Sequence, residues 1–221
     1  MRKLYVVPTP IGNLKDITLR SLEILKEVEY IFCEDTRRTK ILLDHYGIKD
    51  KKLISYFAPK EEEKIPYLLK ILKNHNAVLV VDSGMPAISD PGYKLIKACL
   101  EENIEVEVLP GPSAFLTALI GSGLPPDKFL FLGFLPKKGL KNYLEKLKNL
   151  EITFVFYESP RRILKTLKII KEVFKDGKIV IAREISKIYE EYLRGDLEEI
   201  MKILEKRKLK GEITIVFRKE S

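Results

Sequence analysis

The run Ala77-Val78-Leu79-Val80-Val81-Asp82-Ser83-Gly84-Met85-Pro86 decides the fold class of this 221-residue chain. Its first half is apolar and rich in valine, a pattern typical of a strand buried on both faces. Its second half is made of turn residues, which end the strand abruptly. The run therefore predicts a buried strand that opens into a tight loop.

Comparable apolar runs occur on both sides of this strand, at residues 3–8, 30–33, 53–57 and 104–109. Helical patterns separate them; one begins at Thr18 and carries Leu19, Leu22, Leu25 and Val28 at helical spacing. Strands that alternate with helices predict an α/β domain with a mostly parallel sheet.

A cluster of turn residues at 121–127 predicts a domain boundary, giving domains 1–122 and 123–221. In the second domain we expect strands at 128–135, 152–158, 178–185, 189–193 and 212–218, with helices at 139–149, 160–175 and 196–207. Residues 187–194 look like the second arm of a hairpin, so this sheet should be mixed. The fold class is thus α/β, with two α/β domains.

Several residues are predicted to begin helices. Asp35 should cap the helix after residues 30–33, and Asp90 stands before Pro91, which suits a first helical position. Ser159-Pro160 repeats that pattern. For Asp90, a role as helix cap is the simplest interpretation. For Asp35, a role as helix cap competes with a catalytic role.

Composition excludes several classes of protein. No run approaches 18 apolar residues, and the apolar part of the N-terminus is too short for a signal peptide, so we expect a cytoplasmic protein without membrane spans. Cys33 and Cys99 are far apart, and no ligand set has metal spacing, so neither a disulfide framework nor a metal site is expected. There is no Gly-x-Gly-x-x-Gly and no Walker A sequence.

The net charge of +8 lies entirely in the second half of the chain. Residues 1–122 carry 17 basic and 17 acidic side chains, whereas residues 123–221 carry 23 and 15. Such asymmetry favours a polyanionic partner for the second half. A solvated Lys- and Glu-rich surface explains it equally well.

Four turn-rich segments come directly after predicted strands: 8–13, 34–38, 82–92 and 110–114. In open α/β sheets, ligands bind beyond the carboxyl ends of the strands. Each segment alone is ordinary strand-to-helix turn chemistry. Together, on one edge of one sheet, they predict a binding site.

The four segments resemble, in order and spacing, the ribosomal RNA ribose 2′-O-methyltransferase branch of the tetrapyrrole-methylase superfamily. The most specific matches are Pro8-Thr9-Pro10-Ile11-Gly12-Asn13, Glu34-Asp35-Thr36-Arg37, Ile88-Ser89-Asp90-Pro91-Gly92 and Pro110-Gly111-Pro112-Ser113-Ala114. Residues 132–136, 156–160 and 182–184 support the resemblance from the second half.

The resemblance implies a two-domain cleft that holds S-adenosylmethionine, and a homodimer. The implied cofactor-binding residues are Ile11, Gly84, Met85, Pro86, Ile88, Ser113, Ala114, Tyr157 and Ala182. Asp82, which ends a buried strand, is a further candidate: it either orders the cofactor turn or caps the loop. Two positions depart from the pattern. Met85 stands where a threonine is usual and supplies no hydroxyl, and Arg161-Arg162 stands where a His-Arg pair is common.

Methyl transfer to a ribose 2′-hydroxyl needs an aligned acceptor and help in removing its proton. Glu34 or Asp35 is the expected base, and Arg37 the cation that positions a neighbouring phosphate. Pairing of Arg37 and Arg38 with residues 61–63 is the structural alternative. The expected RNA-binding residues are Arg37, Arg38, Lys137, Lys138, Arg161 and Arg162.

The resemblance therefore implies an enzyme that methylates a ribose in 16S ribosomal RNA, at a cytidine of the decoding region. The expected partner is ribosomal RNA or the small ribosomal subunit. The alternatives are a small-molecule tetrapyrrole methylase and a non-catalytic RNA-binding or assembly factor.

Overall fold

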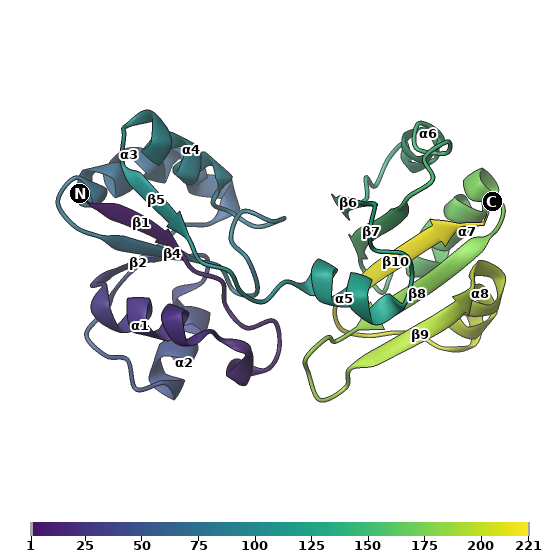
Figure 1. Cartoon of the computed structure of the whole chain (residues 1–221), viewed down its shortest axis with the longest axis horizontal. Helices are drawn as coiled ribbons and strands as arrows, with labels where there is room; N and C mark the ends of the chain where they lie inside the picture. Colours follow the sequence, from purple (N-terminus) through teal and green to yellow (C-terminus); the bar gives the residue numbers. More distant parts are fainter. Residues whose placement is uncertain (1, 221) are drawn as a thin grey trace. The chain divides into compact units, whose positions relative to one another are not determined.

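The computed structural model describes residues 2–220, and its contacts divide the chain between Ser113 and Ala114 into two compact units (Figure 1). The expected boundary lay one helix later, after residue 122. The difference arises because helix α5 (Ala114–Ser122) packs on the sheet of the second unit, against strands β7 (Thr153–Glu158), β8 (Gly177–Arg183) and β10 (Ile213–Lys219).

The first unit contains a five-stranded sheet in the order β3-β2-β4-β1-β5. All its pairings are parallel, which confirms the expected sheet type. Its strands are β1 (Lys3–Val6), β2 (Tyr30–Cys33), β3 (Lys52–Ser55), β4 (Ala77–Val80) and β5 (Glu105–Val108). Every residue of β4 is buried, as its continuous apolar run predicts.

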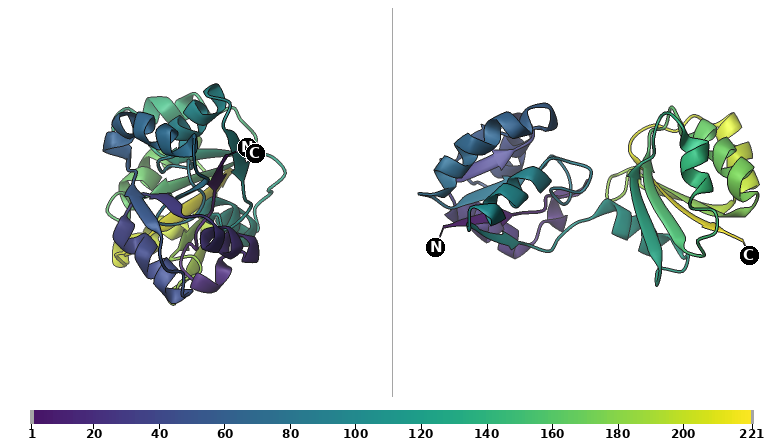
Figure 2. Two further views of the ribbon diagram at one scale, coloured as in Figure 1. Left: turned by 90° about the vertical axis from the view of Figure 1, so that its left-hand side faces the viewer. Right: turned by 90° about the horizontal axis from the view of Figure 1, so that it is seen from above.

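Helices cover both faces of this sheet (Figure 2). Residues of α1 (Leu19–Glu27) and α2 (Thr36–His45) share one apolar core with the sheet. Residues of α3 (Glu61–Leu72) and α4 (Tyr93–Glu101) share a second core on the opposite face. Short 3-10 turns lie at Leu14–Asp16 and Ala58–Lys60. With both faces covered, ligands have access only at the strand ends and loops.

The second unit has a mixed sheet in the order β6-β7-β10-β8-β9, which confirms the expectation. Strand β6 (Phe129–Phe134) runs parallel to β7, whereas β9 (Glu191–Asp196) forms the expected hairpin with β8. Helices α6 (Leu140–Glu145), α7 (Ile163–Phe174) and α8 (Leu197–Lys206) share one core with the sheet. Within residues 2–220, no helix is long and apolar enough to cross a membrane.

Three of the four residues predicted to begin helices make capping bonds, and one does not cap its helix. Thr18 and Asp35 accept the backbone N–H bonds expected at the starts of α1 and α2. The prediction for Asp90 is wrong, because α4 begins at Tyr93 after Gly92, whose φ of 144° suits glycine. Ser159 also makes the predicted capping bonds: its hydroxyl accepts the Arg161 amide at 3.2 Å and its carbonyl accepts the Ile163 amide at 3.1 Å. Residues 160–162 form a turn, however, so regular helix α7 begins only at Ile163.

Candidate functional site

The turns at the ends of β1 and β4 are joined by a pair of backbone hydrogen bonds. The Thr9 amide donates to the Gly84 carbonyl at 2.9 Å, and the Gly84 amide donates to the Thr9 carbonyl at 3.0 Å. The buried Thr9 hydroxyl donates to the Val81 carbonyl at 3.0 Å. These bonds fix the loop after β4 against the end of β1.

The turn after β5 packs against these two turns. Gly84 has a φ of 80°, and a Cβ there would lie 3.4 Å from Ile11 Cγ2 and 3.8 Å from the Pro112 carbonyl. A Cβ on Gly111 would lie only 2.3 Å from Pro8 Cγ. The two glycines therefore allow three loops to meet beyond the carboxyl ends of β1, β4 and β5, as the sequence predicts.

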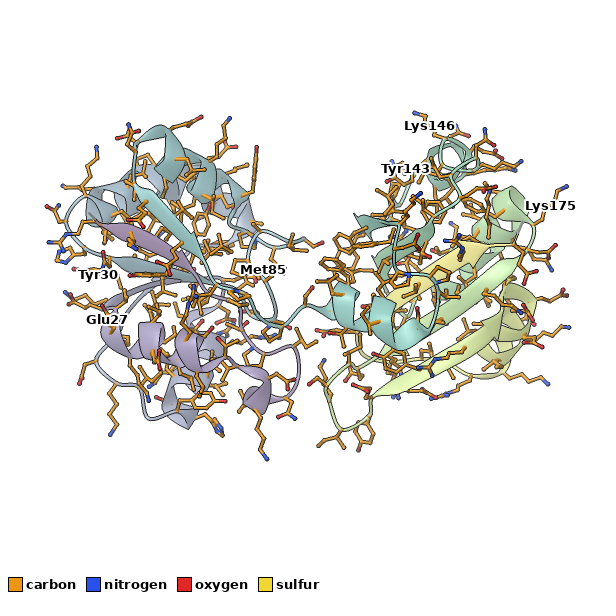
Figure 3. The ribbon with its side chains drawn as sticks, in the orientation of Figure 1. Glu27, Tyr30, Met85, Tyr143, Lys146 and Lys175 are labelled. Carbon is orange, nitrogen blue, oxygen red and sulfur yellow. The ribbon has the colours of Figure 1, made fainter. Side chains whose placement is uncertain are left out.

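The loop after β4 carries more of the expected cofactor-binding residues. Pro86 is buried, while Met85 and Ile88 are half-buried. Figure 3 shows Met85 away from Glu27 and Tyr30, which mark the opposite, amino-terminal edge of the sheet. Ala87 and Ser89 have φ values of 69° and 67°, which non-glycine residues rarely adopt. A loop held in this backbone conformation is typical of a ligand-binding segment.

Acidic and basic side chains meet at the neighbouring ends of β2 and β4. The Asp35 amide donates to Asp82 Oδ1 at 3.2 Å, and the Asp82 amide lies 3.5 Å from Glu34 Oε2. The carboxylate at the end of β4 thus accepts from a backbone amide after β2, and a carboxylate after β2 lies near the backbone amide at the end of β4. This reciprocal bonding ties the expected substrate segment to the expected cofactor loop.

Two arginines of α2 face these carboxylates. Arg37 binds Asp35 through Nε at 3.0 Å and Nη2 at 2.7 Å, while Arg38 Nε lies 3.3 Å from Asp82 Oδ2. The alternative pairing of Arg37 and Arg38 with residues 61–63 is therefore not what the structure shows. The Arg37 side chain is 87% exposed, so it is accessible to an anionic group in solution.

The three carboxyl groups differ in acidity. Hydrogen bonds from Arg37 lower the pKa of Asp35 to about 2. Burial and the nearby charge of Asp82 raise the pKa of Glu34. Burial also raises the pKa of Asp82, and Arg38 opposes that shift. Glu34 is thus the stronger base of the two expected candidates, because Asp35 is neutralised by its arginine.

Within residues 2–220, no group of three His, Cys, Asp or Glu side chains is arranged to hold a metal ion. The carboxylates of Glu34, Asp35 and Asp82 are directed to backbone amides and arginines.

The second unit holds the other expected cofactor-binding residues. Tyr157 on β7 and Ala182 on β8 both pair with Thr214 of the intervening strand β10, so the two lie on one face of the sheet with Thr214 between them. Helix α5, which begins at Ala114, packs on these same strands. Ser113, the last residue of the first unit, is half-buried.

The expected RNA-binding residues of the second unit separate into two kinds. Lys137, Lys138 and Arg161 are exposed, and in the described part of the chain their side chains have no ion-pair partner. Arg162 instead donates to the Leu135 and Pro136 carbonyls at 3.3–3.4 Å. Arg162 also lies 3.4 Å from Glu158 Oε2, so its role in this structure is to hold a loop.

Sequence reasoning missed two structural features. The hydroxyl of Thr9 joins two loops, and a polar residue directly after a buried strand was the available signal. Phe134 is the second feature, because its ring is 63% exposed at the end of β6. Phe134 belongs to the segment 132–136 that supports the resemblance, but the sequence does not reveal its exposure, because that exposure depends on the pairing of β6 with β7.

Comparison with known proteins agrees with these features. Residues 3–201 match the family model of the tetrapyrrole (corrin/porphyrin) methylases. The chain is 50% identical to the ribosomal RNA small subunit methyltransferase I of Hydrogenobaculum sp. (strain Y04AAS1), over 99% of this chain and 96% of that protein. It is 48% identical to the protein of the same name from Thermotoga maritima, over 98% of each.

Solved structures give the same fold at low identity. Diphthine synthase superimposes with a TM-score of 0.76 at 17% identity, covering 99% of this chain and 90% of that one. Uroporphyrin-III C-methyl transferase from Thermus thermophilus, complexed with S-adenosylhomocysteine, gives 0.70 at 20% identity, covering 99% and 97%. The chain therefore belongs to the tetrapyrrole methylase family, in the group of the ribosomal RNA small subunit methyltransferase I proteins.

Proposed function

We propose that this protein methylates the 2′-hydroxyl of a ribose in small-subunit ribosomal RNA, at a cytidine of the decoding region. Family membership makes it a ribosomal RNA methyltransferase with S-adenosylmethionine as methyl donor. The observation that carries the ribose proposal is the cluster of Glu34, Asp35 and Arg37 beside the loop after β4, since it combines a base with a phosphate-binding cation.

The residues of the first unit fit the cofactor. S-adenosylmethionine supplies an electrophilic methyl group on a sulfonium and has no phosphate, so it needs no glycine-rich phosphate loop. Gly84 and Gly111 let three loops approach closely, and Ile11, Met85 and Pro86 add apolar surface. We propose that the remaining contacts come from Asp82, Ile88, Ser113, Ala114, Tyr157 and Ala182. With a backbone-made site, Met85 in place of a threonine is tolerated.

We propose Glu34 as the group that accepts the proton of the ribose hydroxyl. Its raised pKa brings it closer to the operating pH, where a general base is most effective. Asp35 is a weaker candidate, because Arg37 occupies its carboxylate. We assign Asp35 the role of orienting Arg37 until a phosphate of the RNA takes its place.

The basic second unit is the proposed RNA-binding part of the chain, through Lys137, Lys138 and Arg161. Arg37 and Arg38 would contribute from the first unit, although Arg38 is engaged with Asp82. Phosphate binding releases counterions, so the logarithm of the affinity should fall linearly with the logarithm of salt concentration. Charge reversal at Lys137, Lys138 and Arg161 together should weaken RNA binding and leave cofactor affinity unchanged.

The decisive experiment is transfer of a labelled methyl group to unmodified small-subunit ribosomal RNA, in parallel with the assembled subunit, followed by mass spectrometry of the nucleosides. A 2′-O-methylated cytidine is expected. Glu34→Gln should lower the single-turnover rate about 100- to 10,000-fold at saturating cofactor. Asp35→Asn should lower the rate less than Glu34→Gln does, because Asp35 acts only through Arg37. Methylation of a base instead of a ribose refutes the proposal.

The two alternatives make different predictions. A tetrapyrrole methylase would methylate uroporphyrinogen-type substrates and would not need the basic second unit. A non-catalytic assembly factor would not bind S-adenosylmethionine or S-adenosylhomocysteine; calorimetry in the presence of a chelator tests this and also excludes a metal requirement.

We further propose that the protein acts in the cytoplasm as a homodimer. Helix α5 carries no charged residue and is mostly apolar, and its Leu116 and Ile120 are 45% and 70% exposed. Apolar side chains exposed on one helix are typical of a protein contact. Sedimentation equilibrium measures the oligomeric state, and a monomer at micromolar concentration refutes the dimer.

A further inference from the structure

Phe134 ends the edge strand β6 just after an irregularity in its pairing with β7. Phe131 pairs with Val155, but Phe134 pairs with Tyr157, so β6 contains one residue more than β7 in this interval. Gly133, with a φ of 60°, lies within this β-bulge. The bulge is therefore a built feature of the strand, and it redirects the chain at the end of β6.

The extra residue turns Phe134 to the other face of the sheet. By regular alternation Phe134 would share the face of Leu130 and Leu132, which pack against the helix-covered core. It shares instead the face of Tyr157, whose ring centroid lies 5.4 Å from its own. A large apolar side chain is thus moved from the core side to a position where it is 63% exposed.

The loop after Phe134 is held firmly and is basic. Leu135 is buried, and Arg162 binds the Leu135 and Pro136 carbonyls. The loop then presents Lys137 and Lys138 to solvent, and Arg161 adjoins the side chain that holds it. An exposed aromatic ring is thereby followed in the chain by two exposed lysines, and the bonds of Arg162 join their loop to the turn that carries Arg161.

This combination fits single-stranded RNA. Unpaired bases stack on exposed aromatic side chains, while nearby lysines and arginines bind the phosphates. We propose that Phe134 is a platform on which an unpaired nucleobase of the RNA substrate stacks, next to Tyr157, with Lys137, Lys138 and Arg161 binding the flanking phosphates. The proposal deepens the RNA-methylating function and rests on it for the identity of the RNA.

The first test uses the absence of tryptophan from the chain. Phe134→Trp introduces a single tryptophan, whose fluorescence can be excited apart from that of the ten tyrosines. A short oligocytidine or the unmodified small-subunit transcript serves as the probe. Stacking should quench the tryptophan fluorescence saturably. Tyr189→Trp, at a residue 72% exposed in the connection between β8 and β9, is the matched control and should respond little. Equal quenching at both positions, or none at position 134, overturns the proposal.

The second test separates stacking from charge. Phe134→Ala should weaken RNA binding about 5- to 150-fold, and Phe134→Tyr should restore it. The slope of log affinity against log salt should stay the same in Phe134→Ala. In Lys137→Ala and Lys138→Ala, by contrast, the magnitude of this slope should decrease by about 0.7 for each phosphate contact that is lost. Affinity for S-adenosylhomocysteine should not change in any of these variants.

Two other outcomes would show that the Phe134 ring has a different role. If Phe134→Ala weakens S-adenosylhomocysteine binding as much as RNA binding, the ring acts by supporting Tyr157, and the proposal fails. If it changes the sedimentation coefficient, the ring belongs to a contact between copies, and the proposal fails. Absence of methyl transfer by the unsubstituted protein, with quenching at position 134 intact, refutes the methylation of RNA but leaves the stacking site standing.

Discussion

Replacing Arg162 by alanine should destabilise the second unit without removing an RNA contact. The guanidinium of Arg162 lies 3.4 Å from Glu158 Oε2, and the Glu158 side chain is only 1% exposed. Its nitrogens also bind the Leu135 and Pro136 carbonyls. Arg162→Ala leaves a buried carboxylate without its cation and releases the loop before α6.

The size of the effect can be worked out from these interactions. Removing one partner of a buried ion pair costs about 3–5 kcal/mol. The loss should be smaller here, because Glu158 keeps hydrogen bonds from the Ser159 amide at 2.7 Å and the Thr166 hydroxyl at 2.6 Å. The Arg162 side chain is also 27% exposed. We expect a loss of about 2 kcal/mol in the free energy of unfolding, or a Tm lowered by about 4–8 °C.

Urea denaturation followed by circular dichroism, together with scanning calorimetry, measures this change. Arg161→Ala is the matched control, because the neighbouring side chain is exposed and its loss should alter stability by less than about 0.5 kcal/mol. The two variants should differ in the opposite sense in RNA binding. Arg161→Ala should weaken RNA binding and reduce its salt dependence, whereas Arg162→Ala should affect RNA binding mainly by destabilising the fold. If Arg162→Ala keeps full stability and loses RNA affinity, the structural role assigned to Arg162 is refuted.

Three further predictions concern the first unit. Gly111→Ala should cost about 1–3 kcal/mol in urea denaturation, since its Cβ would lie 2.3 Å from Pro8 Cγ; unchanged stability contradicts the close packing of these loops. The pKa of Asp35 is lowered to about 2 by Arg37, so the stability that this pair adds is present above the ordinary value of 3.8 and is lost as pH falls towards 2. Asp35→Asn should therefore shift the urea midpoint at neutral pH and cease to do so near pH 2. Burial raises the pKa of Cys33 to about 11, so its thiol should react with a disulfide reagent only after unfolding, and rapid labelling of the native protein refutes this.

The sequence was sufficient for the fold class, because local rules specify it. Alternation of strands and helices, and the uninterrupted apolar run of β4, depend on side-chain periodicity and burial, both readable along the chain. The caps at Thr18 and Asp35 were equally local. The cap predicted at Asp90 failed because a competing signal, the φ of 144° at Gly92, is a property of the folded loop.

Part of the candidate site was also readable. The convergence of the loops around Ile11 and Gly84 is a consequence of the rule that parallel strands end at one edge of their sheet. The acidic and basic residues of the cluster were identified by type, but their partners were not. Arg38 pairs with Asp82 across 44 positions of sequence, and that pairing decides which carboxyl groups remain available as bases.

Tertiary structure alone decided the roles of Arg162 and Phe134. Arg161 and Arg162 are adjacent and identical in type, yet one faces solvent and the other binds two carbonyls and a buried carboxylate. Phe134 is exposed only because a bulge changes its register against β7. Periodicity and composition record what each residue prefers, whereas ion pairing and strand register depend on which distant segments the folded chain brings into contact, and these determine which charges and rings are available to a ligand.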